Sequence, residues 1–132
     1  LTDGTALDFG HRELEGDEGE RSAAFRAWLR HKLDRVERGG FVAFEDVRFN
    51  RGKSYIPGQS AILQAECVER AVPYVGVGVS ELKKWATGHG NAPKDAMIAA
   101  AREWAGREPT ADEADAILVG RWAIENAVKG AA

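Results

Sequence analysis

The residues with the clearest chemical potential are three acids near the start of a predicted helix. The stretch PTADEADAIL, residues 109–118, places Asp112, Glu113 and Asp115 within four positions and then continues with apolar residues. Helix positions three apart lie on one face, with Cβ atoms about 5–6 Å apart, so Asp112 and Asp115 point the same way and Glu113 points elsewhere. A further acid, Glu45, stands where the apolar run FVAF ends. Because ligands of open α/β sheets gather beyond the carboxyl ends of strands, these carboxylates converge if the last helix packs near that strand.

Three converging carboxylates repel one another unless cations neutralise them. Oxygen ligands of this kind suit Mg²⁺ or Mn²⁺. Two such ions about 3.5–4 Å apart can clamp the attacking and leaving oxygens of a phosphodiester displacement. The pattern therefore predicts a site for two metal ions, with Glu45, Asp112 and Asp115 as ligands.

A structural explanation of the same acids stays open. Thr110 and Glu113 have the spacing of a capping box, in which the two side chains satisfy free N–H groups at a helix start. Acids in a first helical turn also complement the helix dipole. These effects account for Glu113 and partly for Asp112, and less well for Asp115, which enters the apolar stretch. Glu45 by itself could be a solvated acid at a strand end.

The bulk properties fit one globular domain over residues 1–132. The chain is 44% hydrophobic and 30% charged, an ordinary mix for such a domain, and no apolar run approaches the roughly 20 residues that span a bilayer. With a single cysteine, Cys67, neither an internal disulfide nor a cysteine-based zinc cluster is possible. We therefore expect a soluble, cytoplasmic protein that does not contact a membrane.

The net charge of −3 hides an uneven distribution. Five acids crowd one short segment: Glu13, Glu15, Asp17, Glu18 and Glu20. The basic residues gather elsewhere, in a group at residues 48–53 and another at residues 83–94. Because local charge matters more than the sum for attracting a polyanion, the acidic total does not exclude a nucleic-acid ligand.

Apolar spacing predicts strands that alternate with helices. We expect strands up to about residue 14, over residues 41–47 and over residues 72–79, the last two buried on both faces. We expect helices over residues 21–38 and 59–71, a short helical turn at residues 80–86, and helices that begin at Pro93 and Thr110. Trp28, Trp104 and Trp122 fall on apolar helix faces and are predicted to be core. This order predicts an α/β fold with helices on both faces of a sheet.

The pattern resembles the RuvC-like Holliday junction resolvases of the ribonuclease H-like superfamily over nearly the whole chain. The matching segments are FVAFEDV, then residues 57–94 from PGQS to NAPK, then ADEADAILVG. Glu45 matches the family's acid at the end of its fourth strand, and Asp112 and Asp115 match an Asp-x-x-Asp on its last helix. Lys83, the turn TGHGNA and Lys94 match a lysine, a glycine-rich turn and a second lysine.

The resemblance implies a metal-dependent endonuclease that cuts branched DNA, with Mg²⁺ or Mn²⁺ as cofactor. The fold would be a ribonuclease H-like mixed sheet flanked by helices. Lys94 would be catalytic and Lys83 DNA-binding, holding the scissile phosphate and its developing charge; otherwise both are solvated surface lysines. A four-way junction needs two symmetric nicks, so we expect a homodimer.

A basic segment follows the strand that carries Glu45. Arg48, Arg51 and Lys53 are candidates for phosphate contacts, which position DNA without reading its sequence. Phe49 is a candidate wedge against unstacked bases at a junction, or else a packing residue of its loop.

The chain departs from the family pattern at its start. The family has three strands before its first helix, and its first catalytic Asp lies on the first of them, whereas only about twenty residues precede Arg21 here. We expect LDFG to be the third strand, and the opening strand with its Asp to be missing from an N-terminally truncated chain; Asp8 as that Asp is the other interpretation. Such a chain would cut poorly. The alternative function is a non-catalytic relative that binds structured DNA and lacks the first acid.

Overall fold

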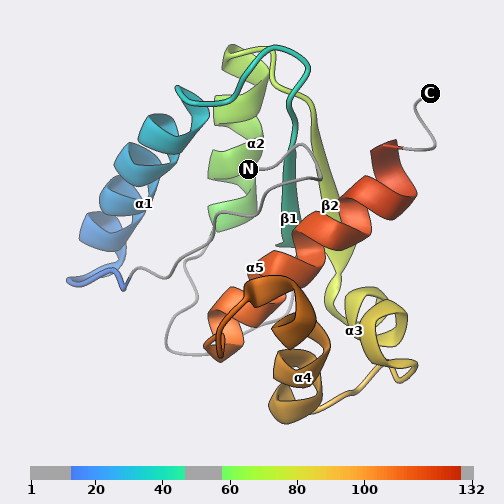
Figure 1. The fold of residues 1–132 in the computed structure, drawn as a ribbon. Coiled ribbons are helices and arrows are strands. Elements are labelled where there is room, and N and C mark those ends of the chain that lie inside the picture. The colour runs from blue at the N-terminus through green and yellow to red at the C-terminus, as the bar shows by residue number, and fades with distance from the viewer. Residues whose placement is uncertain (1–12, 47–57, 129–132) are drawn as a thin grey trace. The chain divides into compact units, whose positions relative to one another are not determined.

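The computed structural model describes residues 13–46 and 58–128, with side chains described to residue 126. Five α-helices, two strands and a π-helical segment follow one another in this part of the chain. They are α1 (Glu18–Leu33), β1 (Val42–Asp46), α2 (Gln59–Glu69), β2 (Tyr74–Gly78), α3 (Val79–Thr87), α4 (Lys94–Ala105), α5 (Ala111–Trp122) and η1 (Ala123–Val128) (Figure 1). The prediction of an α/β protein is confirmed at this level. The predicted strand up to residue 14 falls almost wholly outside the described residues.

The two strands form a parallel pair. A hydrogen bond from Val42 N to Pro73 O, 2.9 Å long, precedes the pairing. The strands also approach closely at Gly76, where an added Cβ would lie 2.9 Å from Phe44 Cζ, so glycine leaves room for the neighbouring ring. The prediction that both strands are buried on both faces is wrong for the described residues: β1 is half-buried throughout, and in β2 only Val77 is fully buried. With two strands in the described sheet, each is an edge.

Residue contacts divide the chain into two compact units. Within the described residues, one unit comprises residues 13–42 and 58–74 and therefore contains α1 and α2. Its core is formed by Phe25, Leu29, Leu33 and Cys67, and Arg30 Nε donates to Glu66 Oε1 at 2.9 Å from helix to helix. The expectation of a single domain stays a prediction.

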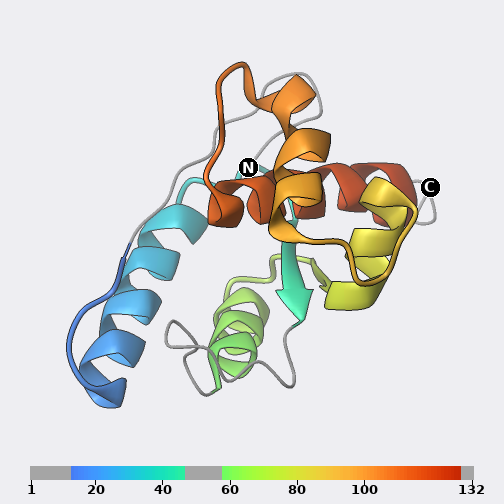
Figure 2. The same ribbon diagram turned by 90° about the horizontal axis from the view of Figure 1, so that it is seen from below.

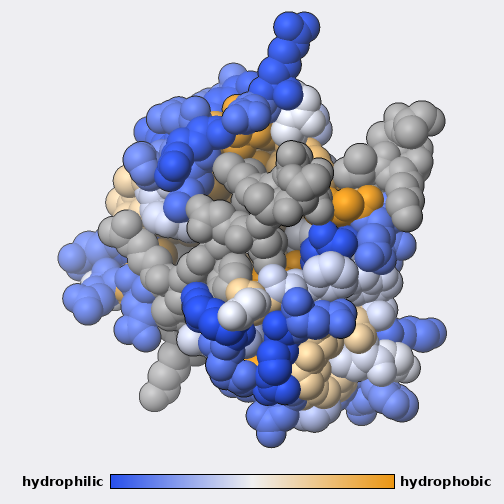
Figure 3. Space-filling view, in the orientation of Figure 1, coloured by the Kyte–Doolittle hydropathy of each residue, from blue (hydrophilic) through white to orange (hydrophobic). Residues whose placement is uncertain are grey.

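Within the described residues, the other unit comprises residues 43–46 and 75–128 and holds all the predicted site residues that the structure describes. Its helices α3, α4 and α5 pack on one another, and both Figure 1 and Figure 2 show α4 lying across α5. The buried cluster of this unit consists of Val77, Leu82, Ala92, Met97, Ala101, Ala114, Ile117, Leu118 and Val119. Among the residues coloured in Figure 3, most of the surface is hydrophilic and apolar surface is limited to small areas, as expected when such residues are inside.

Helix α1 differs from its prediction at both ends. It begins at Glu18 because Asp17 caps it: Glu20 N donates to Asp17 Oδ1 at 2.8 Å, and Asp17 N donates to Glu20 Oε1 at 3.3 Å. Part of the acidic segment is therefore a helix start, where negative charge complements the dipole. The helix ends at Leu33, before the predicted stop at Gly39 and Gly40.

Two further predictions need correction. Helix α3 runs for nine residues, longer than the expected turn, and begins at Val79, which the apolar pattern assigns to the preceding strand. Trp104 is 40% exposed and is not core. The Arg121 guanidinium carbon lies 4.0 Å from the centroid of its ring, so the indole face stacks on a cation at the surface.

None of the helices in the described segments is long and apolar enough to cross a membrane.

Candidate functional site

The start of α5 carries two of the three candidate acids. Thr110 is the N-cap, so Asp112 lies in the first turn and Asp115 in the next. Asp112 is exposed, whereas Asp115 is half-buried. The helix thus presents one carboxylate to solvent and draws the other partly into the protein, as expected from the apolar residues that follow Asp115.

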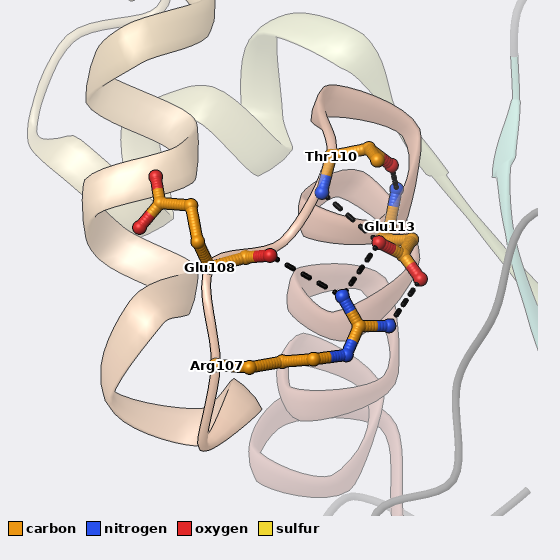
Figure 4. Close-up of polar contacts among 4 residues, drawn as sticks. All are labelled: Arg107, Glu108, Thr110 and Glu113. Carbon is orange, nitrogen blue, oxygen red and sulfur yellow. Dashed lines mark hydrogen bonds and ion pairs between the residues drawn. The ribbon is translucent and has the colours of Figure 1, made fainter.

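Glu113 has the structural role that the capping-box pattern predicted. Glu113 N donates to Thr110 Oγ1 at 3.1 Å, and Thr110 N donates to Glu113 Oε1 at 3.0 Å. Arg107 adds two further donors to the same carboxylate, with Nη2 2.6 Å from Oε2 and Nη1 3.1 Å from Oε1 (Figure 4). The Arg107 guanidinium, aided by the Thr110 N–H, lowers the pKa of Glu113 to about 2. Glu113 is therefore bound to protein groups and faces away from the candidate site.

Glu45 is the last residue but one of β1 and lies on the covered side of the strand. Ala43 packs against the cluster of α4 and α5 side chains, and alternate residues of a strand share a face, so Glu45 points to the same side. Its carboxyl group is half-buried. Burial first, and the Asp115 and Asp112 charges next, raise the pKa of Glu45 to about 7, against the opposing effect of Lys83.

Asp115 is the electrostatic partner of Glu45. Burial and the negative charge of Asp112 raise the pKa of the Asp115 carboxyl, while Lys83 and Lys94 act to lower it. The structure therefore brings Glu45, Asp112, Asp115 and both lysines close enough for their charges to act on one another. Partial burial and neighbouring negative charge disfavour the ionised forms of both acids, and acids perturbed in this way are common at functional sites.

The two lysines come from different helices, Lys83 from the middle of α3 and Lys94 from the start of α4. Lys83 is half-buried in α3, and its carbonyl accepts a 2.8 Å hydrogen bond from Thr87 Oγ1. The Thr87 hydroxyl also accepts from His89 N at 3.2 Å, which fixes the start of the TGHGN turn. Lys94 is the first residue of α4, where a cation opposes the helix dipole. Helix capping therefore does not explain a lysine at this position. Its charge instead acts on Asp115 of α5.

Solved structures of RuvC have a fold similar to that of this chain. The structure of RuvC from Thermus thermophilus is 22% identical to this chain with a TM-score of 0.63, and the match covers 83% of this chain and 72% of that one. A structure of T. thermophilus RuvC in complex with a Holliday junction substrate is 26% identical with a TM-score of 0.62, covering 82% and 71%. The chain has a RuvC-like fold. No protein-family model and no curated protein matches the sequence.

The RuvC-like fold confirms the resemblance seen in the sequence, and the donor chemistry of the site fits a hard cation. Among the described residues, however, no three His, Cys, Asp or Glu side chains form a compact group around one position. Mg²⁺ is usually held by one or two carboxylates, with water and substrate phosphates completing its shell. Glu45, Asp112 and Asp115 therefore suit an open site that is shared with substrate better than a closed protein cage.

Several predicted site residues lie outside the described part of this RuvC-like chain. These are the basic-segment candidates Arg48, Phe49, Arg51 and Lys53, and Asp8, the possible first acid. Their roles stay predictions.

Sequence reasoning missed Arg107 as a partner of the α5 start. The Thr110-to-Glu113 spacing identified the capping box, but Arg107 precedes it in a polar connection that contains a second glutamate, Glu108. Arg107 donates to the Glu108 carbonyl at 3.2 Å, while the Glu108 side chain pairs with Arg102. Nothing in the order of these charged residues indicates which arginine takes which acid.

Proposed function

We propose that this protein is a metal-dependent endonuclease that hydrolyses phosphodiesters in branched DNA, with four-way junctions as substrate. The observation that carries the proposal is the grouping of Glu45, Asp112 and Asp115 with Lys83 and Lys94 in a RuvC-like fold. The T. thermophilus RuvC structure bound to a Holliday junction supports the substrate class.

The acids would hold two Mg²⁺ or Mn²⁺ ions. Bound there, the ions supply Lewis acidity and lower the pKa of an attacking water. Glu45 must lose its proton to serve as a ligand, and the nearby Lys83 charge favours the ionised form. Asp115 is helped in the same way by both lysines. The acidic pair is therefore poised to accept a cation near neutral pH.

Lys83 and Lys94 bind and orient the scissile phosphate. Each carries a positive charge next to the acids, so a phosphodiester drawn to them lies beside the carboxylates. Charge that develops on the phosphate oxygens is stabilised by donors already in place. Lys94 is proposed as catalytic and Lys83 as DNA-binding. Arg48, Phe49, Arg51 and Lys53 would extend the DNA contact beyond the site.

The symmetry of the substrate leads us to propose a homodimer. Resolving a four-way junction takes two nicks related by a two-fold axis, and an isologous dimer offers two equivalent sites in that relation.

The test is a nicking assay on synthetic four-way junctions with Mg²⁺, with Mn²⁺ and with EDTA. It should use the 132-residue chain and also the chain extended by any residues that its gene encodes before Leu1. We expect metal-dependent cutting that Asp115→Asn abolishes. The matched control is Glu103→Gln, which removes an exposed acid of α4 and should leave cutting unchanged.

The outcomes separate the candidate functions. Cutting by the extended chain alone assigns the first acid to the added residues, whereas cutting by the 132-residue chain makes Asp8 the candidate. Tight junction binding with no cutting in either form would overturn the nuclease proposal in favour of the non-catalytic DNA-binding relative.

A further inference from the structure

The connection between α4 and α5 is bonded to the first turn of α5 through one buried carboxylate, that of Glu113. Glu113 is only 4% exposed, and its two oxygens accept three hydrogen bonds, two from Arg107 and one from Thr110 N. The Arg107 end of the pair is 54% exposed, whereas the Glu113 side chain is 5% exposed. A surface residue thus reaches inward to hold an acid of the helix (Figure 4).

Arg107 goes beyond what helix capping requires. The reciprocal bonds between Thr110 and Glu113 complete the capping box without it. Arg107 adds a bidentate ion pair, the strongest and most directional type of side-chain contact. It also bonds the Glu108 carbonyl, so it ties the connection to the helix. Gly106, in the left-handed region at φ +72°, ends α4 and turns the chain into this connection.

The geometry of a helix relates the Arg107–Glu113 ion pair to the acidic site. Each residue turns the helix by about 100°, so Asp112 and Asp115 lie about 60° apart, and Glu113 lies about 100° and 160° from them. Arg107 therefore holds α5 on the side away from the two aspartates. A helix held at that point cannot roll about its axis without moving both of them relative to Glu45.

We propose that Arg107 is a positioning residue for the acidic site: its ion pair with Glu113 fixes the roll and the starting point of α5, and so the placement of Asp112 and Asp115 opposite Glu45. This inference rests on the proposed nuclease function for its catalytic consequence. Its structural part, the immobilised first turn of α5, can be measured without any catalysis.

A neighbouring arginine supplies a matched control. Arg102 pairs with Glu108 through contacts of 2.7 and 3.0 Å, and both side chains are more than half exposed. This pair joins α4 to the connection and makes no hydrogen bond to α5. Arg102→Ala therefore removes an ion pair from the same neighbourhood without releasing the helix start.

The experiment compares Arg107→Ala, Arg107→Lys and Arg102→Ala in the form of the protein that cuts junctions. Because supporting groups around metal ligands change affinity or activity by about 10–100-fold, we expect Arg107→Ala to lower kcat and Mn²⁺ affinity at least tenfold, with KM for the junction within twofold. Arg107→Lys keeps the charge and one donor nitrogen in place of two, so it should recover part of the activity. Arg102→Ala should match the wild type. If Arg107→Ala does not fold, a fall in kcat without a change in KM for Arg107→Lys decides the question.

Amide hydrogen exchange tests the structural part separately. We expect exchange at residues 111–115 to be at least tenfold faster in Arg107→Ala, with residues 43–46 unchanged, since local opening depends on local contacts. If the wild type cuts no junction but this difference appears, the proposed function fails and the positioning role stands. Unchanged exchange at residues 111–115, or unchanged kcat and Mn²⁺ affinity in an active protein, overturns the proposal for Arg107.

Discussion

Replacing Glu45 by glutamine tests whether burial and the neighbouring aspartates raise its pKa as the structure indicates. The carboxyl pKa is raised from 4.5 to about 7 in the folded protein. Between these values the folded state binds more protons than the unfolded state, so the free energy of unfolding falls as pH rises from 4.5 to 7 and then levels off. Glutamine does not ionise. The Glu45→Gln variant should therefore gain stability relative to the wild type over the same interval.

The size of this gain follows from the shift in pKa. A rise from 4.5 to about 7 corresponds to at most about 3–4 kcal/mol at 1.36 kcal/mol per pH unit. Because Glu45 is only partly buried and solvent screens its charge, we expect about 1–2 kcal/mol at pH 8 and almost none at pH 4.5. Asp115 is present in both proteins, so most of its own titration cancels in the comparison.

Urea denaturation in EDTA at pH 5, 6, 7 and 8 measures the difference. Glu103→Gln, which removes an exposed acid of α4, is the control variant. Adding Mg²⁺ at pH 8 should restore more stability to the wild type than to Glu45→Gln, because a ligand that binds only the folded state stabilises it. A stability difference that does not change with pH would refute the raised pKa of Glu45.

Three further measurements address the lysines, Asp115 and the helix cap. Changing both Lys83 and Lys94 to alanine should flatten the log–log salt dependence of binding to duplex arms by about 0.9 for each phosphate that the protein no longer neutralises; an unchanged slope, measured by fluorescence anisotropy, would mean that neither lysine touches the DNA backbone. Asp115→Asn should leave junction affinity in EDTA equal or higher, because it removes a negative charge beside the phosphate site, and a marked fall in affinity would contradict that placement. Thr110→Ala should lower the free energy of unfolding by about 1 kcal/mol because the N-cap is removed, and thermal melts that show no loss of stability would contradict this capping role.

The α5 start and its acids could be predicted from the sequence because their geometry is local. A helix fixes the relative direction of residues three apart, so Asp112 and Asp115 had to share a face. Likewise, the Thr110 and Glu113 side chains reach each other's backbone within a single turn. The capping box of Asp17 and Glu20 at the start of α1 is equally local. Its spacing is present in the sequence, but it lies within a run of five acids and was not distinguished from them.

Other features depended on which elements pack together. Glu45 could be placed at a strand end from the sequence, but its partial burial and raised pKa arise only when one face of β1 packs on the buried cluster and Asp115 lies nearby. Trp104 has the spacing of a core residue, yet the crossing of α4 over α5 leaves it at the surface against Arg121.

The partner of Glu113 illustrates what the sequence alone does not determine. Arg102 and Arg107 both lie near Glu108 and Glu113 in the sequence, and an ion pair needs only opposite charge and reach. The left-handed turn at Gly106 and the direction in which α5 leaves the connection determine that Arg107 takes Glu113 and Arg102 takes Glu108. Periodicity and capping are properties of short segments and are written in the sequence, whereas the choice among equivalent charged partners belongs to the tertiary structure.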